Sequence, residues 1–110
     1  MILNQSGQSI EIDGTVFAVG VRIGANNKSE YYGLEGRIIE IVTDDDKDTE
    51  NEGPDIYCCF DTPTEQKIIK RLEKDFSNIF CSPRTIDDII LDNVIMSSEE
   101  IYVIENPQQE

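Results

Sequence analysis

The 110-residue sequence contains no histidine, and this absence excludes several common catalytic sites. Ser-His-Asp and Cys-His arrangements both need an imidazole that takes up and returns a proton. Zinc sites built from Cys and His would have only three cysteines to draw on, at no useful spacing. Carboxylates are plentiful, but nothing marks out a pair with a pKa raised for acid-base catalysis. We therefore expect a protein that is not an enzyme, with no cofactor and no metal site.

Cysteines and long apolar runs are also scarce. The three cysteines are an odd number, and Cys58 and Cys59 are neighbours whose side chains would point to opposite faces of a strand. We expect free thiols that act as strand residues. No apolar run approaches the roughly 18 residues that span a bilayer, and residues 1–5 lack the features of a signal peptide. The expected location is cytoplasmic.

Basic residues are outnumbered, with 9 Lys and Arg against 23 Asp and Glu and a net charge of -14. This charge disfavours direct binding to nucleic acid or anionic membranes, and it favours a basic partner. The acidic residues concentrate in residues 44–61 and 85–110. Between these two regions, a solvated basic helix face or, alternatively, a counter-charge or second contact point is formed by Lys67, Lys70, Arg71 and Lys74.

The length and the 38% hydrophobic content fit one folded domain, for which we expect residues 9–106. Residues 1–8 are polar and predict a flexible, frayed N-terminus or a short edge piece, and residues 107–110 predict a polar tail. Alternation from Ser9 and the dipeptide Asp13-Gly14 predict a hairpin whose second strand is Thr15 to Val19. Gly20 predicts a bulge or sharp bend before the next strand.

Further along the chain, residues 37–42 and 56–60 predict two strands joined by the acidic loop 44–52, a hairpin with an acidic tip. Residues 94–96 and 101–104 predict the closing strands. Thr62-Pro63-Thr64-Glu65 matches a capping box with Thr62 as the N-cap, which predicts an amphipathic helix over about 62–79. Its apolar stripe contains Ile68, Leu72, Phe76 and Ile79. Residues 85–91 predict a short second helix, with a strand as the alternative.

The middle half of the chain resembles the SH3-like small barrels. The resemblance lies in Phe17-x-Val19-Gly20, in the segment Tyr32-Gly33-Leu34-Glu35-Gly36 with the strand after it, and in the return strand that ends near Pro63. The Gly-x-x-Gly turn is similar to that of the KOW-type barrels. This resemblance implies an α+β fold in which the helix accompanies a small, strongly bent antiparallel β-barrel.

The acidic loop partly matches a calcium loop, because Asp44, Asp46 and Asp48 occupy its first, third and fifth positions. Thr49 stands where the turn needs glycine, and Asp55 stands where a bidentate glutamate is expected. No helix precedes the loop. A solvated, mobile hairpin tip is therefore the default interpretation.

Small, acidic, cofactor-free single domains resemble the anti-defence inhibitors of phages and mobile elements, including anti-CRISPR proteins. This likeness of size and charge implies a nucleic-acid mimic, which occupies the basic groove of a nuclease or another nucleic-acid-binding protein, with a CRISPR effector as one candidate. The predicted contact residues are Asp44, Asp45, Asp46, Asp48, Glu50, Glu52 and Asp55.

Two alternatives stay open. An SH3-like adaptor would bind a protein partner through exposed Tyr31, Tyr32 and Tyr57. The negative charge could also serve solubility alone.

Overall fold

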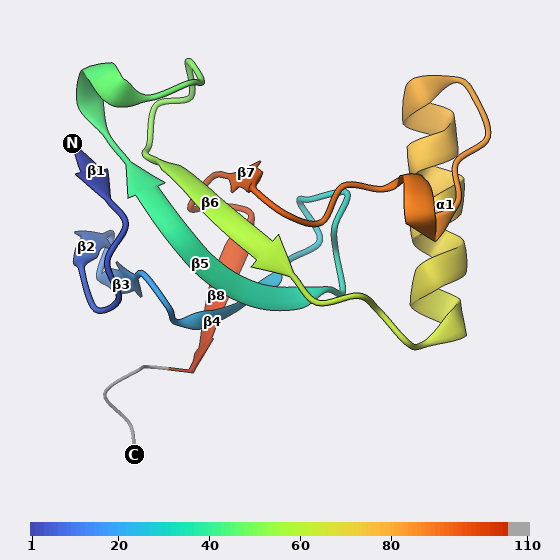
Figure 1. The fold of residues 1–110 in the computed structure, drawn as a ribbon, viewed down its shortest axis with the longest axis horizontal. Coiled ribbons are helices and arrows are strands. Elements are labelled where there is room, and N and C mark those ends of the chain that lie inside the picture. Colours follow the sequence, from blue (N-terminus) through green and yellow to red (C-terminus); the bar gives the residue numbers. More distant parts are fainter. Residues whose placement is uncertain (106–110) are drawn as a thin grey trace.

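The computed structural model describes residues 1–105, which form an α+β fold of antiparallel strands and one α-helix (Figure 1). The helix, α1, is Gln66–Phe80, and two short 3-10 turns are η1 (Asp44–Asp46) and η2 (Ile86–Asp88). The predicted tail over residues 107–110 lies outside the described residues. The strands are β1 (Ile2–Leu3), β2 (Ser9–Ile12), β3 (Thr15–Ala18), β4 (Arg22–Ala25), β5 (Glu35–Val42), β6 (Asp55–Phe60), β7 (Val94–Met96) and β8 (Ile101–Glu105).

The main sheet is open, so the expected closed barrel is not found. Its strand order is β7-β6-β5-β4-β8, and β1 pairs with the far half of β5 beside β4. Within residues 1–105, β7 and β8 lie at opposite edges and do not pair, while β2 and β3 form a separate two-stranded sheet. Alternation in a sequence shows which face of a strand is buried. It carries no information on which strands meet at their edges. The prediction of a barrel therefore rested on the resemblance to SH3-like barrels alone, and it was wrong.

Several predicted strands and turns are confirmed. The β2–β3 hairpin pairs Ile12 with Thr15, and Asp13 and Gly14 both have positive φ (50° and 85°), as a type I′ turn requires. The strands on either side of the acidic loop become β5 and β6, and the two closing strands become β7 and β8. Ile2 and Leu3 form the short edge piece that was one of two expectations for the N-terminus, paired with Val42 and Ile41.

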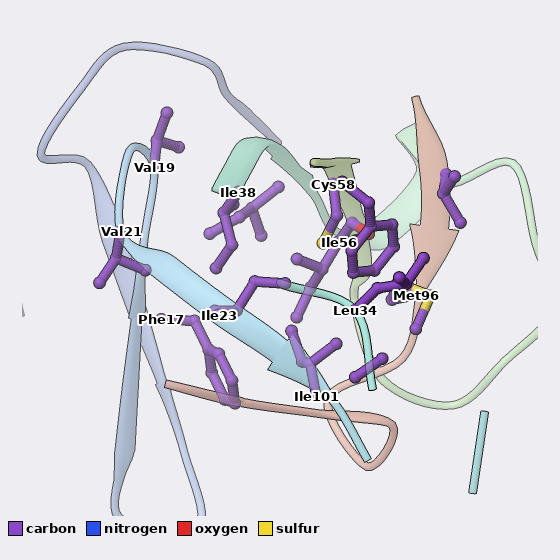
Figure 2. Packing of buried hydrophobic residues seen from close by; sticks show 14 of the residues in the cluster. Phe17, Val19, Val21, Ile23, Leu34, Ile38, Ile56, Cys58, Met96 and Ile101 are labelled. Carbon is purple, nitrogen blue, oxygen red and sulfur yellow. Dashed lines mark hydrogen bonds between the residues drawn. The ribbon is translucent and has the colours of Figure 1, made fainter. Parts of the chain in front are cut away.

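One core lies between the main sheet and the segments that cover it. Figure 2 shows buried side chains from both sheets directed at one interior, and Ile23, Ile38 and Ile56 are fully buried at its centre. The β2–β3 hairpin contributes Phe17 to this core, and α1 contributes Leu72. The register of β5 and β6 shifts between Ile38 and Glu40. This irregularity changes the alternation, so that Ile38 and Ile41 are both buried while Ile39 lies at the surface.

The helix begins later than predicted. Its N-cap is Glu65, with no side-chain capping bond, so the capping box at Thr62 is wrong. The Asp61 N–H donates to Glu35 O (2.8 Å), which continues the β5–β6 pairing, and residues 62–64 are a linker without regular structure. The pairing with β5 therefore overrides a local capping signal that matched in sequence.

The middle and end of α1 follow the prediction more closely. Leu72 and Phe76 are buried, whereas Ile79 and Phe80 at the C-terminal end are 53% and 54% exposed. Cys81 ends the helix in a left-handed conformation (φ 54°). This helix lacks the length and apolar character needed to cross a membrane.

The predicted second helix is only the single turn η2. Thr85 holds that turn, because its N–H and its hydroxyl both donate to Asp88 Oδ2 (3.0 and 3.1 Å). The Asp88 N–H in turn donates to Thr85 O (2.8 Å). The chain leaves helical geometry at Ile89, which is extended, so β-branched residues 89–90 do not prolong the helix.

Candidate interaction surface at the acidic hairpin tip

The acidic tip comprises residues 44–52, between β5 and β6. It contains the turn η1 and projects from the end of the β5–β6 ribbon that lies away from α1 (Figure 1). Six of the predicted contact residues are exposed there, and together they concentrate negative charge on one projection. These are Asp44, Asp45, Asp46, Asp48, Glu50 and Glu52.

Asp55, the seventh predicted contact residue, is fully buried and unavailable for contact with a partner. Its Oδ2 accepts the N–H groups of Asp48 (2.8 Å) and Thr49 (3.0 Å), and its Oδ1 accepts the Thr49 hydroxyl. Burial would raise the pKa of Asp55, but the hydrogen bonds from Thr49 and Asp48 outweigh it, so the pKa lies below its usual value. Asp55 therefore organises the tip from beneath, a role that spacing along the sequence does not reveal.

Other contacts fix the shape of the tip while leaving most of its charge free. The N-terminal amine donates to Asp46 Oδ2 (2.5 Å) and to Thr43 O (3.0 Å), and Lys47 donates to Asn51 O. The Tyr57 hydroxyl donates to Asp48. Among the described residues, Asp46 is the only tip carboxylate in an ion pair. The tip is thus a shaped loop with several carboxylates that lack a counter-ion in that part of the chain.

The three tyrosines do not form one exposed surface. Tyr31 is half-buried, stacks on Phe60 (ring centroids 5.2 Å apart) and donates its hydroxyl to Ile90 O (2.8 Å). Tyr57 lies at the base of the tip, and its bond to Asp48 raises the pKa of Tyr57 to about 12. Tyr32 alone is well exposed (48%), with the Arg71 guanidinium 5.1 Å from its ring centre.

The second acidic region meets the first one in space. Glu99 and Glu100, which precede β8, line a cleft of about 700 Å³ together with Glu52 of the tip and Asp13 of the β2–β3 turn. Lys28 also lines this cleft. In the sequence the two regions lie apart, on either side of α1. The β6–β7 pairing and the β4–β8 pairing bring the ends of these regions together.

The predicted basic face of α1 is formed by Lys67, Lys70, Arg71 and Lys74. Lys67, Lys70 and Lys74 are exposed, and Arg71 donates to Tyr32 O and lies 3.7 Å from Asp75. Within residues 1–105, no ion pair joins these cations to the acidic tip. The helix therefore supplies no intramolecular counter-charge for the tip there.

The cysteines are free thiols, as expected. Burial raises the pKa of Cys58 to about 12, and a hydrogen bond to Asp92 (3.0 Å) raises the pKa of Cys59. Both thiols are thus held in the protonated, weakly nucleophilic form. Across residues 1–105, no three His, Cys, Asp or Glu side chains come together where they could hold a metal ion.

Comparison with protein families, with curated proteins and with solved structures gave no match to this chain.

Proposed function

We propose that this chain is a non-enzymatic binding protein whose acidic tip occupies the positively charged groove of a nucleic-acid-handling protein. In this role it is a nucleic-acid mimic, like the anti-CRISPR inhibitors, and its partner is a basic nuclease, a CRISPR effector or another nucleic-acid-binding protein. The observation that carries the proposal is the tip itself: exposed carboxylates on a projecting loop that the buried Asp55 holds in shape.

The physical basis is the charge that such grooves are built to receive. Duplex DNA presents one negative charge per ~1.7 Å of its axis, and a basic groove gains affinity by releasing counterions. A row of carboxylates can occupy the same groove by the same electrostatics. Because internal hydrogen bonds already fix the tip, binding would order few additional groups, which limits the entropic cost.

This shaping favours mimicry over charge that serves solubility alone. Solubility needs only exposed charge and no particular loop conformation. The adaptor hypothesis has less support, because the hydroxyls of Tyr31 and Tyr57 are bonded within the molecule. Tyr32 would remain as its one well-exposed tyrosine.

The test uses a tip variant and a control variant with the same change in net charge. The tip variant carries Asp44→Asn, Asp45→Asn, Glu50→Gln and Glu52→Gln. The control variant neutralises four exposed acidic residues elsewhere, through Glu11→Gln, Glu30→Gln, Glu65→Gln and Asp87→Asn.

Wild type and both variants are immobilised, exposed to a host lysate and eluted with duplex DNA. We expect wild type and the control variant to retain nucleic-acid-binding proteins that duplex DNA displaces, and the tip variant to lose them. Equal capture by all three proteins would contradict the proposal, as would capture that DNA does not compete away.

A further inference from the structure

Strand β8 leaves one edge of its backbone without a partner strand in residues 1–105. On its inner side, β8 pairs with β4, where Ile101 lies opposite Ala25. The Ala25 N–H donates to Leu34 O (3.0 Å) and Ala25 O accepts from Gly33 N–H, so the backbone of Ala25 points away from β8. Ile101 and Ala25 therefore form a non-hydrogen-bonded pair, and the N–H and C=O of Ile101 point to the open edge. By alternation, those of Val103 do the same.

A cleft lies along this open edge. Its volume is about 400 Å³, and its walls come from β8 and from the β2–β3 hairpin, including Ile101 and Val103 on one side and Ile12 and Phe17 on the other. Ile12 and Glu99 line both this cleft and the larger acidic cleft, so the two clefts adjoin. Each cleft by itself, about 700 and about 400 Å³, is in the range that ligand-binding clefts occupy.

The outer face of β8 adds apolar surface beside the cleft. Tyr102 and Ile104 are 49% and 42% exposed on this edge strand. The Tyr102 ring lies over Gly24 of β4, where a Cβ would come within 2.6 Å of the ring atoms. Natural edge strands are usually protected by lysine, proline or a covering segment. Apolar residues at an uncovered edge instead favour pairing with a further strand.

Charge around the clefts identifies the occupant. Asp13 and Glu99 line both clefts, and Glu52 and Glu100 add to the acidic end, against the single cation Lys28. A second copy of this chain would bring its own net charge of -14 and would be repelled. An extended segment that carries lysine or arginine beside apolar residues is complementary both to the acidic side chains and to the apolar side chains that line the clefts.

We infer that the open edge of β8 is a docking site for a basic, extended segment of a protein partner, which adds to the sheet as a strand. Its main chain bonds to Ile101 and Val103, its apolar side chains enter the cleft beside Ile12 and Phe17, and its cations lie near Glu99 and Asp13. The inference goes beyond nucleic-acid mimicry and does not depend on it.

The probes are three short synthetic peptides: one of alternating lysine and valine, the same peptide N-methylated on every second amide, and one of alternating glutamate and valine. Binding is followed by NMR on the full chain. The lysine peptide should bind and shift the amide signals of Ile101 and Val103. N-methylation or replacement of lysine by glutamate should each weaken binding by at least about tenfold, because strand hydrogen bonds or charge complementarity are lost.

Protein variants complete the test. Glu99→Gln should weaken binding of the lysine peptide severalfold, whereas Asp87→Asn on η2 should leave it unchanged. Equal binding of the N-methylated peptide, equal binding to Glu99→Gln, no binding of the lysine peptide, or an edge already occupied by a second copy would each overturn the inference. A double variant of the tip, Asp44→Asn/Asp45→Asn, leaves the cleft residue Glu52 in place and should keep its peptide binding, which separates this result from failure of the mimicry proposal.

Discussion

At the scale of single residues, Asp55 controls the conformation of the acidic tip. Its carboxylate is buried and accepts hydrogen bonds from the backbone of Asp48 and from both the backbone and the side chain of Thr49. A buried carboxylate is costly unless its oxygens are satisfied, and here the loop satisfies them by folding over it. The sequence places Asp55 among the other acids of this region, and only the structure separates its role from theirs.

Replacing Asp55 by Asn should destabilise the protein. One accepting oxygen would become an NH2 group that faces N–H or O–H donors, and we expect a loss of about 1–3 kcal/mol in the free energy of unfolding. Denaturant titration measures this loss, and hydrogen exchange should show faster exchange of the Asp48 and Thr49 amides. Asp45→Asn, at an exposed position, is the control and should change stability by less than about 0.5 kcal/mol. Similar effects of the two substitutions would contradict the role assigned to Asp55.

The pH dependence of stability follows from the pKa of Asp55. This pKa is lower in the folded protein than the ordinary value of about 3.9, so the folded state favours the charged form. The resulting stabilisation is present above that ordinary value and is lost as pH falls through the lower folded pKa. The stability difference between wild type and Asp55→Asn should therefore shrink in acid. A difference that stays constant from neutral pH to pH about 2 would argue against this linkage.

Gly36 shows a second constraint at this scale. A Cβ at this position would lie 2.2 Å from Cys59 O and 2.7 Å from Phe60 Cα, both backbone atoms of β6. Gly36→Ala should cost about 1–3 kcal/mol, because β5 and β6 would have to move apart. Gly53→Ala is the matched control, since the nearest atom there is 3.8 Å away. Thermal unfolding compares the two variants, and equal midpoints would show that the close approach carries no cost.

At the scale of elements, the short-range patterns predicted the β2–β3 hairpin, the β5–β6 hairpin and the middle of α1. Those elements depend on neighbouring residues: a two-residue turn in one case and helical spacing of Leu72 and Phe76 in another. The start of α1 was wrongly predicted. A backbone hydrogen bond between Asp61 and Glu35, which are far apart in the sequence, extends the sheet pairing past the end of β6. A capping motif involves only residues that are close in the sequence, so it gives no information on such a long-range hydrogen bond.

The capping positions give a prediction that separates sequence pattern from structure. Thr62→Ala should change stability by less than about 0.5 kcal/mol, because Thr62 lies outside the helix and caps nothing. Thr85→Ala should cost about 0.5–2 kcal/mol, because Thr85 is the N-cap of η2 and its hydroxyl donates to the Asp88 carboxylate. Chemical denaturation measures the free energy of unfolding of both variants. A larger effect at Thr62 would restore the capping box that the structure lacks.

At the scale of the whole molecule, the fold distributes charge unevenly between two ends. The acidic tip projects from one end of the β5–β6 ribbon, and α1 with its lysines lies at the other (Figure 1). The overall charge and the exposed acids of the loop could be predicted from composition. The meeting of Glu52 with Glu99 and Glu100 in one cleft could not, because it follows from strand pairing between distant segments.

The open sheet belongs to this scale too. The resemblance to small barrels predicted antiparallel strands, which are found, and a barrel, which is not, because β7 and β8 remain at opposite edges within residues 1–105. The free edge of β8, with the adjoining cleft, depends on the placement of the β2–β3 hairpin in a separate sheet. Edge exposure is a property of the assembled molecule, so no local pattern reports it.

The most direct test of mimicry is the salt dependence of binding between this chain and a nucleic-acid-binding protein that it captures, compared for wild type and the tip variant. Mimicry predicts that wild-type affinity falls steeply as salt rises, because the groove takes its counterions back. The tip variant should bind more weakly at low salt and show a clearly shallower slope, while the control variant follows wild type. Parallel slopes and equal affinities for wild type and tip variant would contradict the account.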